Sequence, residues 1–320
     1  MPDESARRRS EPGRRSEPAG IVDAVQERRT LLGVAYRLLG SLADAEDAVQ
    51  ETYIRWYRLN DNERGAVAHP RAWLIKTASR ICLDMLTTAR ARRERYVGEW
   101  LPDPIPTPDR WTSQDRSAVI DPAERMAVDD SVAMALLVVL ESMTPAERVS
   151  FVLHDVFRYT YFEIADIVGR TPAACRQLAS SARRHVREER HHTVDPALHA
   201  AAVQAFRTAW KNGDLAVLID VLDPDATAVT DGGGRVSASH DPLHGPRAIA
   251  SFLLGVLDRQ PDLTIETELV NGQPGLVATD TQGHVLAVIA LGTTTTGKIK
   301  HVWAVRNPEK LTIWHSQPAR

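Results

Sequence analysis

The side chains best suited to chemistry in this chain are Arg176 and Gln177, because both can pair with the edges of nucleic acid bases. Arginine forms paired hydrogen bonds with guanine, and glutamine forms them with adenine. These residues open the second of two helices predicted within residues 160–188, the layout of a helix-turn-helix. Gly169 permits the sharp turn, and Thr171 followed by Pro172 predicts an N-cap and a first helical residue. We therefore expect a helix that reads DNA, beginning at about Pro172.

The polar side of this second helix supplies further candidates for DNA binding. Ser180 and Ser181 follow the base-reading pair along the exposed face, and the later arginines are better placed for phosphates. Loss of Arg183 should therefore weaken binding to all sequences alike. The candidate DNA-reading residues are Arg170, Thr171, Arg176, Gln177, Ser180, Ser181, Arg183 and Arg184. The alternative is a solvated basic helix packed in a helical bundle.

Composition bounds the class of protein. The chain has 320 residues, enough for two or three domains, and 43% hydrophobic with 25% charged residues is ordinary for a globular protein. No uninterrupted apolar run approaches the ~20 residues of a membrane helix, so we expect no membrane association. The net charge of −3 predicts that DNA contacts come from local patches. The two cysteines, Cys82 and Cys175, exclude a disulfide framework and a multi-cysteine zinc site; we expect no metal, no cofactor and a cytoplasmic protein.

The pattern along the chain predicts five segments. These are a disordered tail at 1–20, a helical unit at 21–95, a Pro/Asp-rich linker at 96–122, a second helical unit at 123–192 and an α+β domain at 195–320. In the first unit a helix ends at Gly40, Ser41 caps the next helix, Asn60 to His69 form a polar loop, and a long helix begins at Pro70. The linker carries Asp103, Asp109, Asp115 and Asp121, which either imitate nucleic acid or belong to a simple tether.

The last segment begins with two helices and continues as alternating strands. We expect helices at 196–212, 215–222 and 246–257, and strands at 226–230, 235–238, 263–270, 275–279, 285–291 and 299–306. Gly-rich turns separate the strands, including DGGGR at 231–235 and NGQPG at 271–275. This order predicts a curved antiparallel sheet with helices, in an α+β domain.

Three motifs in their order give a resemblance to a known family. The first unit carries DAEDAVQETYIRWY and PRAWLIKTASRICLDMLTTARARR, and the second ends in the helix-turn-helix. Together they resemble the bacterial extracytoplasmic-function sigma factors over about residues 21–192. WLPDP at 100–104, DGGGR and NPEKL at 307–311 resemble signatures of the sigma-J type, which bears a SnoaL-like C-terminal domain. DGGGR and NPEKL depart from the expected pattern at one Lys and one Asp.

The resemblance implies a role for each unit. The first would be sigma domain 2, which docks on the β′ clamp helices of core RNA polymerase through Asp47, Gln50 and Glu51 and opens the −10 element. The −10 side would consist of Trp73, Lys76, Thr77 and Arg80. The second would be sigma domain 4, which reads the −35 element, with the polymerase β flap as a further partner. For Trp73 the alternative is a core tryptophan, and for the acidic face it is a solvated surface.

The resemblance also implies that the C-terminal domain regulates the sigma factor within the same chain. The regulatory motifs would be Trp100, Leu101 and Pro102; Asp231, Gly232, Gly233, Gly234 and Arg235; and Asn307, Pro308, Glu309, Lys310 and Leu311. Two other functions stay open. One is a SnoaL-type enzyme with a DNA-targeting arm and a small ligand in its cone, although Asp231, His240, Asp241 and His244 form no persuasive catalytic set, so we assign no catalytic residue. The other is an operator-binding regulator, which would not need the face around Gln50.

Overall fold

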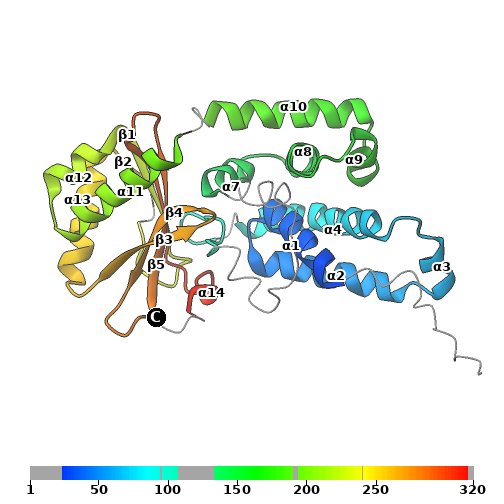
Figure 1. The fold of residues 1–320 in the computed structure, drawn as a ribbon, viewed down its shortest axis with the longest axis horizontal. Coiled ribbons are helices and arrows are strands. Elements are labelled where there is room, and N and C mark those ends of the chain that lie inside the picture. The colour runs from blue at the N-terminus through cyan, green and yellow to red at the C-terminus, as the bar shows by residue number, and fades with distance from the viewer. Residues whose placement is uncertain (1–23, 94–95, 107–132, 190–193, 240, 316–320) are drawn as a thin grey trace, which may run out of the picture.

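The computed structural model describes residues 24–93, 96–106, 133–189, 194–239 and 241–315. A helical half lies beside a half built on one sheet (Figure 1). The predicted fold class, two all-α units followed by an α+β domain, is confirmed. The predicted tail at 1–20 and the linker beyond Pro106 lie outside the described residues. None of the described helices is long and apolar enough to cross a lipid bilayer.

The first helical unit consists of α1 (Ala24–Leu39), α2 (Leu42–Arg58), α3 (Asp61–Ala66) and α4 (Pro70–Arg93). As predicted, α1 ends at Gly40, and the Ser41 hydroxyl accepts a hydrogen bond of 3.3 Å from the Asp44 amide at the start of α2. The loop expected at 60–69 is wrong in part, because it contains α3. Asn60 and Glu63 form a reciprocal capping box there, which stabilises even this short helix.

The second helical unit consists of α7 (Met134–Glu141), α8 (Pro145–Phe151), the π-helical turn η1 (Val152–Val156), α9 (Tyr161–Val168) and α10 (Pro172–Glu189). The helix-turn-helix is α9 and α10. Gly169 takes the left-handed conformation (φ 70°), and α10 begins at Pro172 as predicted. The Thr171 hydroxyl accepts a hydrogen bond of 3.2 Å from the Ala174 amide and so caps α10.

The two helical units share one hydrophobic core. Leu38 of α1, Leu74 of α4 and Ile164 of α9 are buried in the same cluster. Arg148 of α8, only 2% exposed, adds a buried polar link: its Nη1 donates to the Leu38 carbonyl at 2.9 Å and to Glu141 Oε1 at 2.6 Å. Units that are separate in the sequence are therefore packed as one body.

The C-terminal half is built on a six-stranded sheet in the order β2-β1-β6-β5-β4-β3. The strands are β1 (Leu222–Asp231), β2 (Leu243–His244), β3 (Thr264–Val270), β4 (Gln273–Thr279), β5 (Val285–Thr293) and β6 (Ile299–Val305). One face packs against α11 (Pro196–Lys211), α12 (Leu215–Val221) and α13 (Pro246–Arg259), which lie on the outer side of the sheet in Figure 1.

Two details of this sheet differ from the prediction. The sheet is mixed and not wholly antiparallel, because β1 runs parallel to β6. The strand expected at 235–238 is wrong, and the second strand is the short β2. Gly233 and Gly234 both have positive φ, and the amides of Arg235 and Val236 bond back to the Gly232 carbonyl, so this segment forms a turn and does not extend.

The opposite face of the sheet is covered by segments from the rest of the chain. Its apolar cluster includes Trp303 of β6, Leu101 of the linker and Trp314 of α14 (Thr312–His315). Met134 of α7 joins the same cluster, whereas Leu137 of α7 belongs to the helical core. Helix α7 therefore lies between the two halves of the molecule, which explains why it is apolar on all sides.

Candidate functional site

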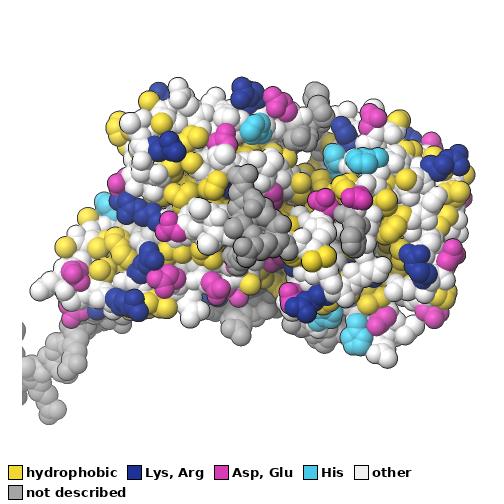
Figure 2. All heavy atoms as spheres, turned by 180° about the vertical axis from the view of Figure 1, so that it is seen from behind, with side chains coloured by type: hydrophobic (Ala, Val, Ile, Leu, Met, Phe, Trp, Pro, Cys, Tyr) yellow, Lys and Arg dark blue, Asp and Glu magenta, His cyan; other side chains and the backbone are white. Residues whose placement is uncertain are grey.

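The helix-turn-helix keeps most of its predicted DNA-reading residues accessible. Arg176, Gln177 and Ser180 are exposed on α10, which lies at the outer edge of the helical half (Figure 1). Arg170 and Thr171 are exposed at the turn, and Ser181 is half-buried. On the face seen in Figure 2, Lys and Arg side chains are scattered among Asp and Glu. Any DNA contact must therefore come from a local surface such as α10.

The two later arginines of α10 have different surroundings. Arg184 is exposed, 4.0 Å from the carboxylate of Glu188. Nη1 of Arg183 bonds to both carboxylate oxygens of Asp155, at 3.0 and 3.1 Å. The charge of Arg183 is therefore already paired inside the protein, and we expect its loss to loosen α10 as well as to weaken phosphate contacts.

Two of the four predicted −10 residues, Lys76 and Arg80, contact α9. Lys76 Nζ bonds to the Asp166 carboxylate, whose pKa is lowered by that hydrogen bond, and Arg80 Nη2 donates to the Asp166 carbonyl at 2.6 Å. Thr77 is half-buried. The half-buried Trp73 packs on Trp56, with ring centroids 5.2 Å apart. In this arrangement Asp166 of the second helical unit pairs with Lys76 and Arg80 of α4.

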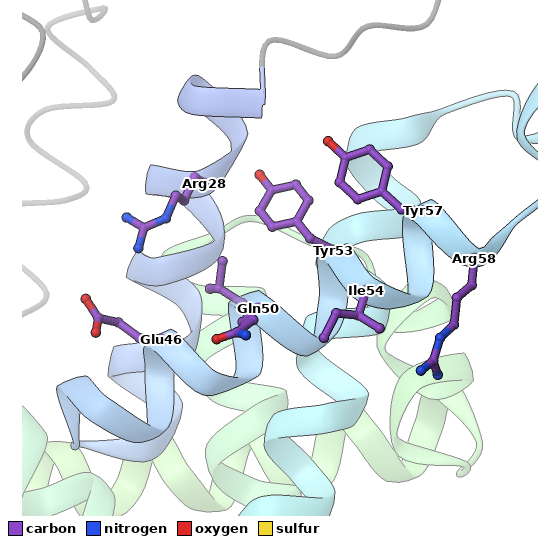
Figure 3. A pocket seen from close by; sticks show the side chains of 8 residues that line it. Arg28, Glu46, Gln50, Tyr53, Ile54, Tyr57 and Arg58 are labelled. Carbon is purple, nitrogen blue, oxygen red and sulfur yellow. The ribbon is translucent and has the colours of Figure 1, made fainter.

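The face of α2 predicted to bind polymerase borders an open groove of about 630 Å³. Tyr53 and Tyr57 project from α2 on the same side, their ring centroids 6.3 Å apart, and Arg28 of α1 lines the same groove with its guanidinium directed away from the two rings (Figure 3). Gln50 is exposed at its edge, and Ile54 contributes apolar surface. The groove combines aromatic, apolar and charged groups, the composition of a protein-binding surface.

The other two residues of the predicted polymerase face flank this groove. Asp47 is exposed and does not line it. Glu51 is half-buried and accepts a hydrogen bond of 2.9 Å from Arg55, one helical turn later. An exposed pair of this kind holds its side chains only weakly, by about 0.3 to 0.5 kcal/mol, so Glu51 can exchange Arg55 for another partner.

The three predicted regulatory motifs meet at the carboxylate of Asp231, the last residue of β1. Asp231 is 0% exposed. Its Oδ1 accepts from the Tyr96 hydroxyl at 2.6 Å and from the Gly233 amide at 3.1 Å. Its Oδ2 accepts from the Leu101 amide at 3.0 Å and from Lys310 Nζ at 2.8 Å. All the acceptor positions of this carboxylate are thus used, by donors from four separate positions in the chain.

Lys310 is the cation of this joint, by which we mean Tyr96, Leu101, Asp103, Asp231 and Lys310. Besides Asp231, its ammonium bonds to the Leu101 carbonyl and lies 3.9 Å from Asp103 Oδ1. It also lies 4.1 Å from the centroid of the Trp100 ring, within cation–π range. Only 8% of the Lys310 side chain is exposed. Two carboxylates and one ammonium are therefore buried together, where a missing partner is costly.

The remaining residues of the predicted motifs lie around the joint. Asn307 Nδ2 donates to the Tyr96 hydroxyl at 2.8 Å. The Asn307 side chain also lies so close to Gly233 that a Cβ at position 233 would overlap the Asn307 amide. Arg235 and Glu309 form an exposed ion pair of 2.5 Å at the rim. Leu311 and Pro102 are buried, Pro308 is exposed and Gly232 and Gly234 complete the turn.

The joint continues into the first helical unit through the linker. Asp103 Oδ2 accepts a hydrogen bond of 2.7 Å from the Leu42 amide, and the Asp103 amide donates to the Gly40 carbonyl at 2.9 Å. The Tyr36 hydroxyl donates to the Asp103 carbonyl at 2.6 Å and accepts from Asn271 at 2.9 Å. Asn271 is the tip of the β3–β4 hairpin. Asp103 is therefore part of a buried contact, neither an exposed imitation of nucleic acid nor a simple tether.

The cone is the space between the curved sheet and the helices α11 and α13 that pack on it. The candidate catalytic residues do not line its interior. Its cavity is about 50 Å³, lined mainly by apolar side chains such as Phe206, with Thr230, Gln260 and Arg306 as polar groups. Small-molecule sites usually enclose about 300 to 1,000 Å³. Asp231 lies in the joint, Asp241 and His244 are exposed, and His240 lies outside the described residues. No metal-binding group of three or more His, Cys, Asp or Glu occurs in the described ranges.

Sequence reasoning missed several partners in these sites. Tyr96, Tyr36 and Asp166 carried no motif, because each acts through a contact far away in the sequence. Asn271 had a local signal, the Asn-Gly pair of a tight hairpin turn, but nothing in that signal indicated contact with Tyr36.

We expect Lys310→Met to lower the free energy of unfolding by about 3 to 5 kcal/mol, because it leaves the buried Asp231 and Asp103 carboxylates without a cation. Arg235→Met is the matched control, because its pair with Glu309 lies in the same motifs but is more than half exposed. That change should cost at most about 1 kcal/mol. Urea denaturation measures both values, and equal losses would contradict this account of the joint.

Asp103 should give the protein a distinct pH dependence. Burial raises the pKa of its carboxyl from 3.8 to about 6, against the opposing effect of Lys310. The folded state then binds the proton more tightly than the unfolded chain, so this group loses stability as the pH rises from about 4 to about 6. We expect its contribution to fall by about 1 kcal/mol between pH 5 and pH 7. Asp103→Asn should remove that slope in urea denaturation; a variant with the wild-type slope would refute the assignment.

Comparison with known proteins agrees with the geometry of all three units. Residues 24–92 match the family model of sigma-70 region 2, residues 133–186 that of sigma-70 region 4, and residues 203–310 that of a SnoaL-like domain. The ECF RNA polymerase sigma factor SigJ of Mycobacterium tuberculosis is 36% identical over 301 residues, covering 89% of this chain and 91% of SigJ. The probable ECF sigma factor SigI of the same species is 36% identical over 286 residues, covering 89% and 92%.

A solved structure gives the same result. The crystal structure of Mycobacterium tuberculosis SigJ matches with a TM-score of 0.70 and 33% identity, over 92% of this chain and 98% of that one. The chain therefore belongs to the extracytoplasmic-function RNA polymerase sigma factors, which are transcription initiation factors and not enzymes, and it bears a SnoaL-like C-terminal domain.

Proposed function

We propose that this sigma factor reads the −35 element with α10 and the −10 element with α4, and that its own C-terminal domain controls when both can act. The observation that carries the proposal is the pairing of Lys76 and Arg80 with Asp166, in a molecule whose three regulatory motifs meet at Asp231. The described form would be the restrained one. As a sigma factor it binds core RNA polymerase and promoter DNA, and we place this activity in the cytoplasm.

The distance between the two promoter elements supports the proposal that the described form is restrained. The −35 and −10 elements lie about 25 base pairs apart by their numbering, or about 85 Å at about 3.4 Å per base pair. Helices packed in one core lie only about 10 Å apart. Helices α4 and α9 share such a core through Leu74 and Ile164. The two helical units must therefore separate before one molecule can contact both elements.

The cone would favour the packed form through two contacts. The joint fixes the linker and, through Asp103, the start of α2 in the first unit. Met134 fixes α7 of the second unit against the sheet. Because one domain holds both units, opening either contact loosens the arrangement that pairs Asp166 with α4. Regulation in cis therefore needs no separate anti-sigma protein.

The groove beside Gln50 is the surface we assign to the β′ clamp helices, with the β flap as a partner of the second unit. A helical partner can lay its apolar face across Tyr53 and Tyr57, with Gln50 placed at the edge to bond to polar groups. The accessible Tyr57 ring, 62% exposed, matches the aromatic anchors that dominate protein interfaces. Asp47 and Glu51 would add electrostatic contacts at the rim.

Run-off transcription from a mixed promoter library with purified core polymerase tests the proposed function. We expect the wild-type chain to stimulate initiation. Arg176→Ala should lose about 1 to 3 kcal/mol of discrimination at one −35 position. Lys310→Met, which loosens the joint, should raise the transcript yield several-fold, whereas Arg235→Met should not.

Two outcomes would contradict the proposal. No initiation by any variant would contradict the −35 and −10 assignments. Equal yields from Lys310→Met and wild type would contradict regulation through the joint.

Binding to core polymerase alone tests the groove. We expect Tyr57→Ala to raise the Kd for core polymerase about tenfold, because truncating an aromatic anchor costs more than about 1 kcal/mol of binding free energy. Val217→Ala serves as the control, since Val217 is an exposed apolar residue (43%) on the cone. Fluorescence anisotropy of labelled protein measures both. An unchanged Kd for Tyr57→Ala would show that the clamp helices dock elsewhere.

A further inference from the structure

Two arginines of α10, the exposed Arg176 and the half-buried Arg183, touch the same side chain, Tyr161 at the start of α9. The Arg176 guanidinium lies over the Tyr161 ring, 5.4 Å from its centroid. Arg183 Nη1 lies 3.4 Å from the Tyr161 hydroxyl, in addition to its bonds to Asp155. Tyr161 itself is half-buried and packs against the helical core. A single aromatic side chain therefore lies between the first helix of the motif and the base-reading helix.

Tyr161 is in turn held by η1. The His154 ring stacks on it, with centroids 4.1 Å apart and an interplanar angle of 27°, and His154 Nδ1 lies 2.9 Å from the Tyr159 carbonyl. The next residue, Asp155, holds Arg183. Successive residues of a helix point in different directions, about 100° apart in an α-helix, so His154 and Asp155 of η1 can meet different partners. Here η1 directs His154 and Asp155 to neighbouring points on α9 and α10.

This arrangement matters because a free arginine side chain has many rotamers. A base-reading arginine must adopt one of them, and the entropy lost on binding reduces both affinity and discrimination. An aromatic ring beneath the guanidinium restricts it before DNA arrives, at an exposed position that still leaves its fork open to a base. Arg176 is exposed on the outer side of α10, so its contact with Tyr161 does not bury the base-reading edge.

We infer that Tyr161 is a positioning residue for −35 recognition: its ring orients Arg176 for one base pair, while Asp155 holds α10 through Arg183. The inference rests on the proposed reading of the −35 element by Arg176. It assigns a role in promoter choice to η1 and the start of α9, neither of which needs to touch a base.

The test uses full-length protein in holoenzyme, with promoters that carry each single substitution in the −35 element. Tyr161→Leu, which removes the ring, should reduce discrimination at the Arg176 position about two- to fivefold and leave the other positions unchanged. Tyr161→Phe, which keeps the ring, should retain it. Phe162→Leu is the matched control, because the neighbouring Phe162 is 79% exposed. In an Arg176→Ala background, Tyr161→Leu should have no further effect at that position.

The outcomes separate the two claims. If Arg176→Ala loses no discrimination, the −35 assignment fails, and the role of Tyr161 fails with it. If Arg176→Ala loses discrimination but Tyr161→Leu retains it, or lowers binding equally at every position, Tyr161 is only structural and the inference alone is overturned. The Tyr161→Phe variant keeps the test decisive if Tyr161→Leu folds poorly: loss of discrimination in the Phe variant would also overturn the role of the ring.

Discussion

The buried carboxylate of Asp231 is the constraint on which the arrangement of this protein depends. A fully buried charge is tolerated only when its acceptor positions are filled, and the donors to Asp231 come from Tyr96, Gly233, Leu101 and Lys310. Two of these donors belong to the linker region and one to the end of the chain. Releasing the linker would remove the Tyr96 and Leu101 donors from Asp231 and separate Asp103 from Lys310, whereas Lys310 and Gly233 belong to the C-terminal domain and stay with Asp231. Because these contacts are lost together, the joint is cooperative.

The C-terminal domain contacts both helical units, through the joint and through α7. The linker residues that bond to Asp231 continue into Asp103, which fixes Gly40 and Leu42 between α1 and α2. On the same face of the sheet, Met134 ties α7 to the cone. The exposed ion pairs of Lys76 and Arg80 with Asp166 contribute little by themselves. They instead mark where the second unit covers α4, an arrangement that the joint and the shared core stabilise.

Local chemistry in the sequence predicts the features that neighbouring residues determine. Gly169, Thr171 and Pro172 specify the helix-turn-helix, and the order of the motifs along the chain identifies the family. Contacts between distant segments left no comparable signal, so the parallel pairing of β1 with β6, the Asp166 contact and the role of Tyr96 could not be predicted. Arg183 shows the same limit: its type and spacing suggested phosphate binding, whereas Asp155 already holds its charge.

The most direct test of the account is the distance between the two helical units, measured by pulsed electron paramagnetic resonance between spin labels at Thr88→Cys on α4 and Glu188→Cys on α10. Cys82 and Cys175 are buried, so the labels should attach only at the introduced positions. We predict a single short distance in the free protein and a much longer one in the promoter complex with core polymerase. An unchanged distance in a complex that initiates transcription would contradict the account.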